Sequence, residues 1–328
     1  MELSRRQALA GAAMTAALPL FQSNHASADA VAPQHQVASY YRYKVGDILV
    51  TVVSDGAATF PLADNFVLNA NRDQVNAALD KAFRPKDQLT IPFGPLVLNT
   101  GGKTVLIDTG SGAAAFTKSK GAVGQFGANS AAAGVDLSKI DMVVIPHFHG
   151  DHVGGLLTAD NKPAFPNAEI LVPEVEWKFF MDDGEMSRAP AGRMQAVFKE
   201  NRRVFDALGR KVTPYQWGKD VAPGLLAVET IGHTPGHTSF VLSSGNDKVF
   251  IQSDVTNTPD LFVRNPGWHV SYDQIPDVAE ATRRKVYDML VAERLKVQGY
   301  HYPFPGVGNI EKDGSGYRVV PVAWNPSI

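Results

Sequence analysis

Short apolar runs separated by polar turns extend along most of the chain. Some have the length of β-strands, and a few longer stretches repeat apolar residues at the spacing of an amphipathic helix. Strands often follow one another in pairs before a helix intervenes, which favours a layered α/β sandwich over a strictly alternating parallel sheet. The predicted strands are 47–53, 95–98, 104–107, 142–145, 170–172, 226–231, 239–242 and 248–251, and the predicted helices are 72–83, 193–208 and 278–293.

The first 30 residues have a pattern of their own. Arg5 and Arg6 precede a small, apolar run, and two A-x-A sequences follow it, ending at Ala28 and Ala30. This order of charged, apolar and small residues is typical of a cleavable export signal, and the arginine pair resembles the twin-arginine type. The alternative is a basic amphipathic helix that belongs to the mature domain.

We therefore expect residues 1–30 to be a cleavable signal, cut after Ala28 or Ala30, and the mature protein to be periplasmic or secreted. Residues 31–38 are predicted to be a mobile mature N-terminus, and residues 39–328 to form one folded domain. The apolar run of the signal is shorter than the roughly 20 residues that a membrane span needs, so no membrane anchor is predicted.

The amino-acid composition limits the partners, metal sites and nucleophiles that the chain can have. The chain has 328 residues, of which 44% are hydrophobic, with 31 basic and 33 acidic residues and no cysteine. The net charge of −2 argues against a nucleic-acid partner, which usually requires a basic excess. The absence of cysteine excludes disulfides, thiolate zinc sites, iron–sulfur clusters and a cysteine nucleophile. Any bound metal must therefore be held by histidine and carboxylate side chains.

The metal-binding residue types gather directly after the predicted strand 142–145. His147, His149, Asp151 and His152 lie within six residues. Two histidines separated by one residue point to the same side of an extended loop, and the next pair faces a neighbouring volume. One loop can therefore supply ligands to two adjacent metals. The alternative is a polar surface loop in which histidines happen to cluster.

The run His147-x-His149-x-Asp151-His152 resembles the signature of the metallo-β-lactamase superfamily. The resemblance implies an α/β fold of the metallo-β-lactamase type, an αββα four-layer sandwich. The closest likeness is to methyl parathion hydrolase and its lactonase and arylesterase relatives. Further similar segments are Ile107-Asp108-Thr109-Gly110, the stretch from Gly232 to Thr238, Gln252-Ser253-Asp254, Gly299-Tyr300-His301, Pro303-Phe304-Pro305-Gly306 and the stretch from Tyr317 to Val322.

Carried over residue by residue, the resemblance implies seven ligands for two divalent metals. His147, His149 and His233 would hold one ion, Asp151, His152 and His301 the other, and Asp254 would bridge both. Asp254 and Asp151 are also the candidate catalytic residues. His237 is the alternative to His233 and is otherwise expected beside a ligand. Asp108 is expected to support a ligand, or alternatively to stabilise a turn.

Such a site implies hydrolysis by a hydroxide that bridges the metals, acting on a hydrophobic lactone or aryl ester, with organophosphate triesters as secondary substrates. Zinc is the expected metal, although manganese, iron and cobalt accept the same ligands. The resemblance also suggests a homodimer. The alternatives are an N-acyl homoserine lactone hydrolase, which Asn257 disfavours because the best-known type has tyrosine there, and a periplasmic metal-binding protein without catalysis. Asp254, where the commonest β-lactamases have cysteine, argues against β-lactam hydrolysis.

A hydrophobic substrate requires an apolar wall beside the metals. Several large apolar residues on predicted loops and helices are candidates for this pocket, although each of them taken singly fits ordinary core packing as well. The candidates are Phe66, Phe116, Trp177, Phe180, Phe198 and Leu261.

Overall fold

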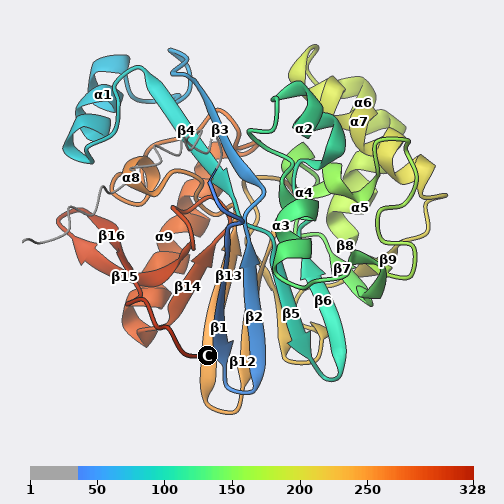
Figure 1. Cartoon of the computed structure of the whole chain (residues 1–328). Helices are drawn as coiled ribbons and strands as arrows, with labels where there is room; N and C mark the ends of the chain where they lie inside the picture. The colour runs from blue at the N-terminus through green and yellow to red at the C-terminus, as the bar shows by residue number, and fades with distance from the viewer. Residues whose placement is uncertain (1–35) are drawn as a thin grey trace, which may run out of the picture. The chain divides into compact units, whose positions relative to one another are not determined.

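The computed structural model describes residues 36–328, and two seven-stranded sheets lie within this part of the chain (Figure 1). The predicted signal and most of the predicted mobile terminus fall outside the described residues. Residues Ala38–Ile328 group into one compact unit. None of the described helices has the length and hydrophobicity of a membrane span.

The first sheet is built from the first half of the domain. Its order is β1-β2-β5-β6-β7-β8-β9, antiparallel from β1 to β6 and parallel from β6 to β9. The predicted strands 95–98 and 104–107 are confirmed as β5 and β6, which form an antiparallel hairpin. The strands are β1 (Tyr40–Val45), β2 (Ile48–Val53), β5 (Leu96–Thr100), β6 (Lys103–Ile107), β7 (Met142–Val144), β8 (Glu169–Pro173) and β9 (Thr213–Tyr215).

The second sheet takes the strands of the second half in chain order. All neighbours are antiparallel except β13 and β14, whose parallel pairing requires a crossover through a helix. The strands are β10 (Asp220–Ala222), β11 (Leu225–Glu229), β12 (Thr238–Ser244), β13 (Asp247–Ser253), β14 (Lys296–Gly299), β15 (Val307–Asp313) and β16 (Gly316–Pro321).

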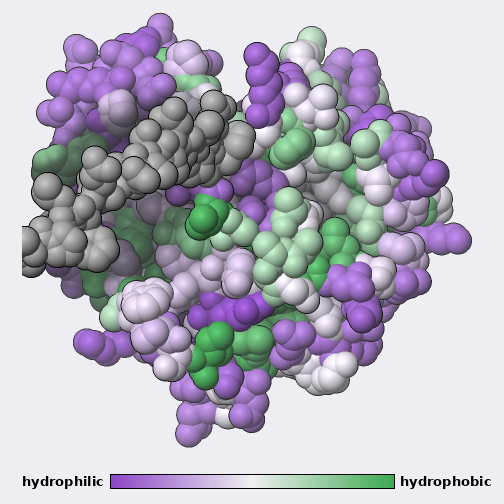
Figure 2. Space-filling view, in the orientation of Figure 1, coloured by the Kyte–Doolittle hydropathy of each residue, from purple (hydrophilic) through white to green (hydrophobic). Residues whose placement is uncertain are grey.

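The helices lie outside the two sheets, and a separate hairpin of β3 (Gly56–Pro61) and β4 (Gln88–Phe93) packs with α1 and α8. The three predicted helices are confirmed as α1, α7 and α9. Hydrophilic residues cover α1 on the face seen in Figure 2. The helices are α1 (Arg72–Lys81), α2 (Gly112–Lys118), α3 (Phe126–Ala132), α4 (Gly150–Val153), α5 (Glu174–Met181), α6 (Asp183–Arg188), α7 (Arg193–Ala207), α8 (Pro259–Phe262) and α9 (Pro276–Glu293), with 3₁₀ turns Leu137–Lys139 and Gly154–Leu156.

The apolar residues separate into layers that explain this stacking. Alternate side chains of both sheets, such as Val50 and Phe240, meet in one buried cluster between the sheets. The opposite face of the first sheet packs on α4, α5 and α7 through residues such as Phe148 and Phe205, and that of the second packs on α9 through Leu290. Because each sheet buries one face on the other sheet and one on helices, the predicted αββα four-layer sandwich is confirmed.

Candidate metal centre

The central loop of the site follows β7, a strand that is buried along its whole length. His147 and His149 lie on this loop, and Asp151 and His152 lie on the short helix α4, which His149 precedes in an extended conformation. The 3₁₀ turn after α4 packs tightly on a neighbouring loop, since a Cβ on Gly155 would lie 2.0 Å from the Thr109 carbonyl oxygen. This close approach holds α4 against the end of β6.

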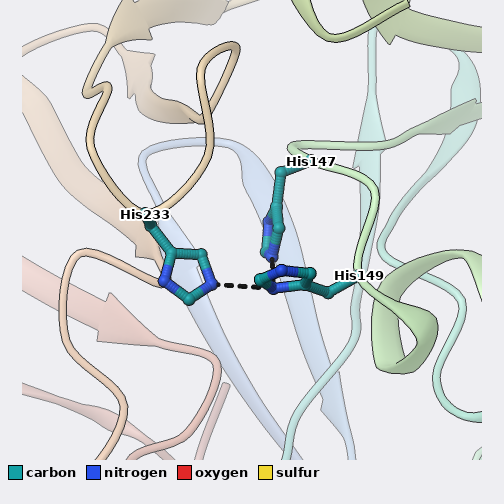
Figure 3. Close-up of side chains that lie close together, drawn as sticks. All are labelled: His147, His149 and His233. Atoms are coloured by element: carbon teal, nitrogen blue, oxygen red, sulfur yellow. Dashed lines mark hydrogen bonds between the residues drawn. The ribbon is translucent and has the colours of Figure 1, made fainter. Parts of the chain in front are cut away.

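Three histidines converge in a first cluster (Figure 3). The Nδ1 atom of His149 lies 3.2 Å from Nε2 of His147 and 2.9 Å from Nε2 of His233. Nitrogen atoms that bind one tetrahedral zinc ion at about 2.0 Å lie roughly 3.3 Å apart. The side chains of this cluster, which we call the histidine cluster, thus have nearly the spacing that one shared ion requires.

A second cluster contains Asp151, His152, Asp254 and His301. The Nε2 atom of His301 lies 3.0 Å from Oδ2 of Asp254 and 3.3 Å from Oδ2 of Asp151. The Nε2 atom of His152 lies 3.4 Å from each of the two carboxylates. This group, which we call the mixed cluster, has two imidazoles and two carboxylates facing one point.

The Asp254 carboxylate also reaches the histidine cluster. Its Oδ2 atom lies 3.4 Å from Nε2 of His233 and 3.9 Å from Nε2 of His147. Asp254 is 5% exposed and follows Ser253, whose φ of 50° is left-handed. Such strained backbone is concentrated at functional sites. The position between both clusters is the one that a bridging ligand needs.

Three of the candidate histidine ligands have a hydrogen-bond partner at Nδ1 that fixes the orientation of the ring. Their Nε2 atoms are then directed at the centre of the two clusters. The Nδ1 atom of His152 lies 2.6 Å from Asp108, and that of His233 lies 2.8 Å from Asp273. His301 donates from Nδ1 to the Pro92 carbonyl at 2.8 Å. Carboxylate and carbonyl partners of this kind orient metal-binding histidines. Asp108 therefore lies behind His152, on the side of the ring away from the cluster centre.

His237 has both ring nitrogens engaged away from the clusters. Its Nε2 atom accepts the backbone N–H of Asp254 at 3.0 Å, so in the neutral ring Nδ1 carries the proton and donates to the Thr230 carbonyl. Burial lowers the pKa of His237 to about 3, assisted by the charge of His233, and keeps this ring neutral. The geometry thus favours His233 over His237 as the ligand and gives His237 the task of positioning Asp254.

Unsatisfied polar atoms at the centre fit a bound cation. Within residues 36–328, His152 Nε2 and Asp254 Oδ1 are buried and lack a hydrogen-bond partner. Buried polar atoms without partners are costly, and coordination of an ion would satisfy both. The set of five imidazoles and two carboxylates is one that zinc and related divalent metals accept. The residues present therefore fit two metals.

The pKa shifts separate the two clusters. Burial lowers the pKa of His147 and of His149 well below the usual range, and the neighbouring histidine charges add to the effect. Neutral imidazole is the form that binds a metal. Burial opposes protonation of His152 as well, but Asp108, Asp151 and Asp254 outweigh it and raise the pKa of this ring. The carboxylates at the mixed cluster thus favour a positive charge beside them, which a bound cation would also supply.

Three buried charged residues that support the site were missed by sequence reasoning. Glu176 accepts backbone hydrogen bonds from Phe148 at 2.9 Å and Gly236 at 2.7 Å, so it joins the two loops of the histidine cluster. Asp273 binds His233 with one oxygen and the Arg283 guanidinium with the other. The sequence held one signal for such a residue, a charged side chain at a helical position that faces inward. Arg283 lies four residues after Ala279, on the buried face of α9.

The predicted substrate pocket needs correction. Only Phe198 among the six candidates lines a cavity beside the clusters. Phe180 and Trp177 pack in the core between the first sheet and its helices, and Phe66 and Leu261 pack in the core of the β3–β4 hairpin. Phe116 is 45% exposed on α2. The four core residues pack where the inward faces of their helices and loops meet other apolar residues.

The cavity at the clusters has a volume of about 390 Å³. Asp151, Asp254 and His301 lie in its wall together with His149 and His233, so both clusters face one space. Its apolar lining comes from the β3–β4 hairpin, from α7 and from the loop before α9. The apolar wall residues are Phe60, Ile91, Phe93, Val197 and Tyr272.

Comparison with known families agrees with this geometry. Residues 96–293 match the family model described as Metallo-beta-lactamase superfamily. The chain belongs to this superfamily. Among curated proteins, anti-Pycsar protein Apyc1 of Paenibacillus sp. (strain J14) is 32% identical over 140 residues, or 40% of this chain and 52% of that protein. The Apyc1 protein of Saccharibacillus brassicae is 29% identical over 133 residues, or 39% and 51%. The chain thus spans about half the length of the curated relatives it matches.

Solved structures match the fold over a larger share of this chain than the curated relatives do. AidC, described as a dizinc quorum-quenching lactonase in complex with a product, has a TM-score of 0.81 at 24% identity, covering 89% of this chain and all of that chain. The hydrolase AbOPH of the beta lactamase superfamily has a TM-score of 0.80 at 26% identity with the same coverage. A quorum-quenching N-acyl homoserine lactone lactonase has a TM-score of 0.55 at 18% identity, covering 81% of this chain and all of that chain.

Proposed function

We propose that this chain is a metal-dependent hydrolase that opens lactones and cleaves hydrophobic carboxylic esters. One observation carries the proposal, namely that the Asp254 carboxylate lies within 3.4 Å of ring nitrogens from both clusters. A carboxylate placed in this way can bind two ions at once, which is the arrangement of two-metal hydrolases. The histidine cluster would hold one ion and the mixed cluster the other, with Asp254 shared between them.

Two divalent ions bound there would acidify a water molecule and polarise the substrate carbonyl. The residues of the chain hold and orient the groups around them. Asp254 is fixed from behind by the hydrogen bond of its backbone N–H to His237. The Asp151 side chain is 26% exposed and contacts His152 and His301 through Oδ2, which leaves Oδ1 to accept a proton from the reacting water. Asp254 and Asp151 are therefore the candidate catalytic carboxylates.

The cavity supports a neutral, partly apolar substrate. Phe60, Ile91 and Phe93 of the β3–β4 hairpin face the clusters and would pack against a ring or chain of the substrate. Lactones come first because AidC, whose fold this chain shares at a TM-score of 0.81, is described as a lactonase. N-acyl homoserine lactones are the more specific candidate within this class. Aryl esters follow the same carbonyl chemistry, and phosphotriesters are retained as a separate test.

Removal and return of the metal tests the function. We expect turnover of dihydrocoumarin and p-nitrophenyl acetate to disappear with EDTA and to return with Zn²⁺ or Mn²⁺. A panel of lactones, N-acyl homoserine lactones, aryl esters and a phosphotriester at fixed metal loading then ranks the substrate classes by kcat/KM. If the metal-loaded protein turned over none of these substrates, the proposal would fail in favour of a metal-binding protein without catalysis.

We also propose that the chain is exported through a twin-arginine signal. The support is the order of Arg5, Arg6, the apolar run and the two A-x-A sequences, all of which lie outside the described residues. Replacing both arginines by lysine should retain the unprocessed protein in the cytoplasm of a bacterial host. Unchanged processing and export of this variant, measured by cell fractionation and mass spectrometry, would contradict the proposal.

A further inference from the structure

A second cavity of about 470 Å³ adjoins the one that holds the clusters. The two cavities share four wall residues, namely His149, Arg193, Val197 and Tyr272. A molecule whose reacting group lies at the metal clusters can therefore extend into the second cavity past these residues. Neither the superfamily signature nor the seven candidate ligands accounts for this second space.

The second cavity is largely apolar where it leaves the shared wall. Phe179 of α5 and Met194 and Phe198 of α7 line it, next to Pro190. The other charged residues of its wall are already paired, Glu185 with Arg188 at 2.8 Å and Asp273 with Arg283 at 3.1 Å. A wall of this kind suits an alkyl or acyl chain, since burial of each CH₂ group is favourable.

Arg193 is the charged group at the junction of the two cavities. Its guanidinium carbon lies 4.3 Å from the centre of the Tyr272 ring, and Nη1 donates to the Ser271 carbonyl at 3.3 Å. No carboxylate of residues 36–328 forms an ion pair with it, whereas the other three arginines of α6 and α7 all have such partners. A guanidinium has five N–H donors, so most of those of Arg193 remain for a ligand.

We propose that Arg193 selects substrates that carry an acceptor oxygen, a carbonyl or carboxylate, between the scissile carbonyl and an apolar tail. The oxygen accepts hydrogen bonds from Arg193, and the tail occupies the second cavity along Met194 and Phe198. This inference rests on the proposed hydrolase function, because the scissile carbonyl must lie at the metal clusters. Stacking on Tyr272 holds the guanidinium plane in place, which lowers the entropy lost when the oxygen binds.

The test compares two lactones of similar length in the zinc-loaded protein. N-octanoyl homoserine lactone has an amide carbonyl between ring and tail, and γ-dodecalactone has the tail alone. A hydrogen bond to a charged group contributes about 1.5–3 kcal/mol, which corresponds to roughly ten- to hundredfold in kcat/KM. Arg193→Met should lose about this factor on the amide substrate and less than threefold on the alkyl lactone. Arg203→Met, an exposed arginine on the same helix, should change neither.

Binding separates this inference from the proposed function. A carbocyclic analogue, 2-octanamidocyclopentanone, keeps the amide and tail but lacks the scissile ester, and its Kd can be measured by calorimetry without turnover. We expect Arg193→Met to raise this Kd by the same factor. If Arg193→Met lost kcat/KM equally on both lactones, selection by Arg193 would be overturned. An unchanged Kd of the analogue in this variant, or no binding of the analogue to the wild type, would overturn it as well. If the protein turned over no lactone but Arg193→Met still raised the Kd of the analogue, only the hydrolase proposal would be contradicted.

Discussion

The Glu176 carboxylate accepts the backbone N–H of Phe148 at 2.9 Å, and Phe148 is the residue between His147 and His149. Its second oxygen accepts the backbone N–H of Gly236 at 2.7 Å, in the loop that carries His233. The Phe148 carbonyl accepts from Asn201 of α7 at 2.9 Å, so this peptide is held at both ends. Glu176 therefore fixes the distance between the two loops that form the histidine cluster.

Glu176→Gln should weaken metal binding at the histidine cluster. One glutamine oxygen can replace one carboxylate oxygen, but the NH₂ group would face a backbone N–H and push one loop away. Loss of groups that orient metal ligands typically costs 10–100-fold in metal affinity. We expect a rise of about tenfold in the Zn²⁺ Kd of the weaker site, measured by competition with a chromophoric chelator.

Glu174→Gln is the matched control, because Glu174 lies on the same helix but is paired with Lys178 near the surface. Its Zn²⁺ affinity should equal that of the wild type. Equal affinities for wild type and Glu176→Gln would show that the loops keep their spacing without this carboxylate.

Glu176 should also make stability depend on pH. Burial raises its pKa from 4.5 to about 7, although the backbone N–H groups of Phe148 and Gly236 oppose the rise. The folded protein holds the Glu176 proton more tightly than the unfolded chain does. The contribution of this proton to the stability of the fold is therefore complete below pH 4.5 and is lost as the pH rises through about 7. The loss amounts to roughly 3 kcal/mol at about 1.4 kcal/mol per pKa unit.

Urea unfolding of the EDTA-treated protein measures this effect. The stability difference between wild type and Glu176→Gln should be more favourable to the wild type at pH 5 than at pH 8. A difference that is the same at both pH values would contradict the raised pKa.

Asp254→Ala should reduce metal content and activity together. The substitution removes the carboxylate that contacts His233 in one cluster and His301 in the other. We expect fewer than two zinc ions per chain by atomic absorption and a loss of at least about a hundredfold in kcat, because both ions lose a ligand. Full metal content in this variant would argue against the bridging position.

His233→Ala and His237→Ala should differ in kind. His233 directs Nε2 at His149 in the histidine cluster, so its loss removes a ligand and lowers metal content. His237 holds the backbone N–H of Asp254, so its loss should lower kcat while most of the metal stays bound. Zinc analysis of the two purified variants decides between them, and the opposite order would exchange the two assignments.

Arg283→Met should destabilise the fold. Arg283 is 1% exposed and donates to three backbone carbonyls and to Asp273, which in turn holds His233. Removing one partner of a buried ion pair costs about 3–5 kcal/mol, because the other charge stays buried. The free energy of unfolding in urea should fall by this amount.

Arg284→Met is the control on the same helix, since its ion pair with Glu280 lies at the surface and contributes about 0–1 kcal/mol. The double variant Arg283→Met with Asp273→Asn should recover part of the loss, because it leaves no charge without a partner. A loss for Arg283→Met no larger than that for Arg284→Met would contradict the structural importance of the pair.

The local pattern of the chain determined about half of the strands, the three longest helices and the ligand candidates. Periodicity within short windows predicted eight of the sixteen strands within residues 36–328 and the helices α1, α7 and α9, since strand and helix periods are local properties. The close spacing of His147, His149, Asp151 and His152 marked a metal loop because chain connectivity alone keeps these side chains together. The resemblance extended the set to His233, Asp254 and His301, and the structure brings all seven into two adjoining clusters.

Only the tertiary structure decided what surrounds the ligands. Glu176 reaches Phe148 across 28 positions and Gly236 across 60, and Asp273 reaches His233 across 40, so no local pattern could pair them. The aromatic residues predicted for the pocket show the same limit. Phe180 on α5 and Phe198 on α7 are both buried phenylalanines, yet of the two only Phe198 lines the second cavity. The packing of α5 and α7 on the sheet determines which ring faces the open space.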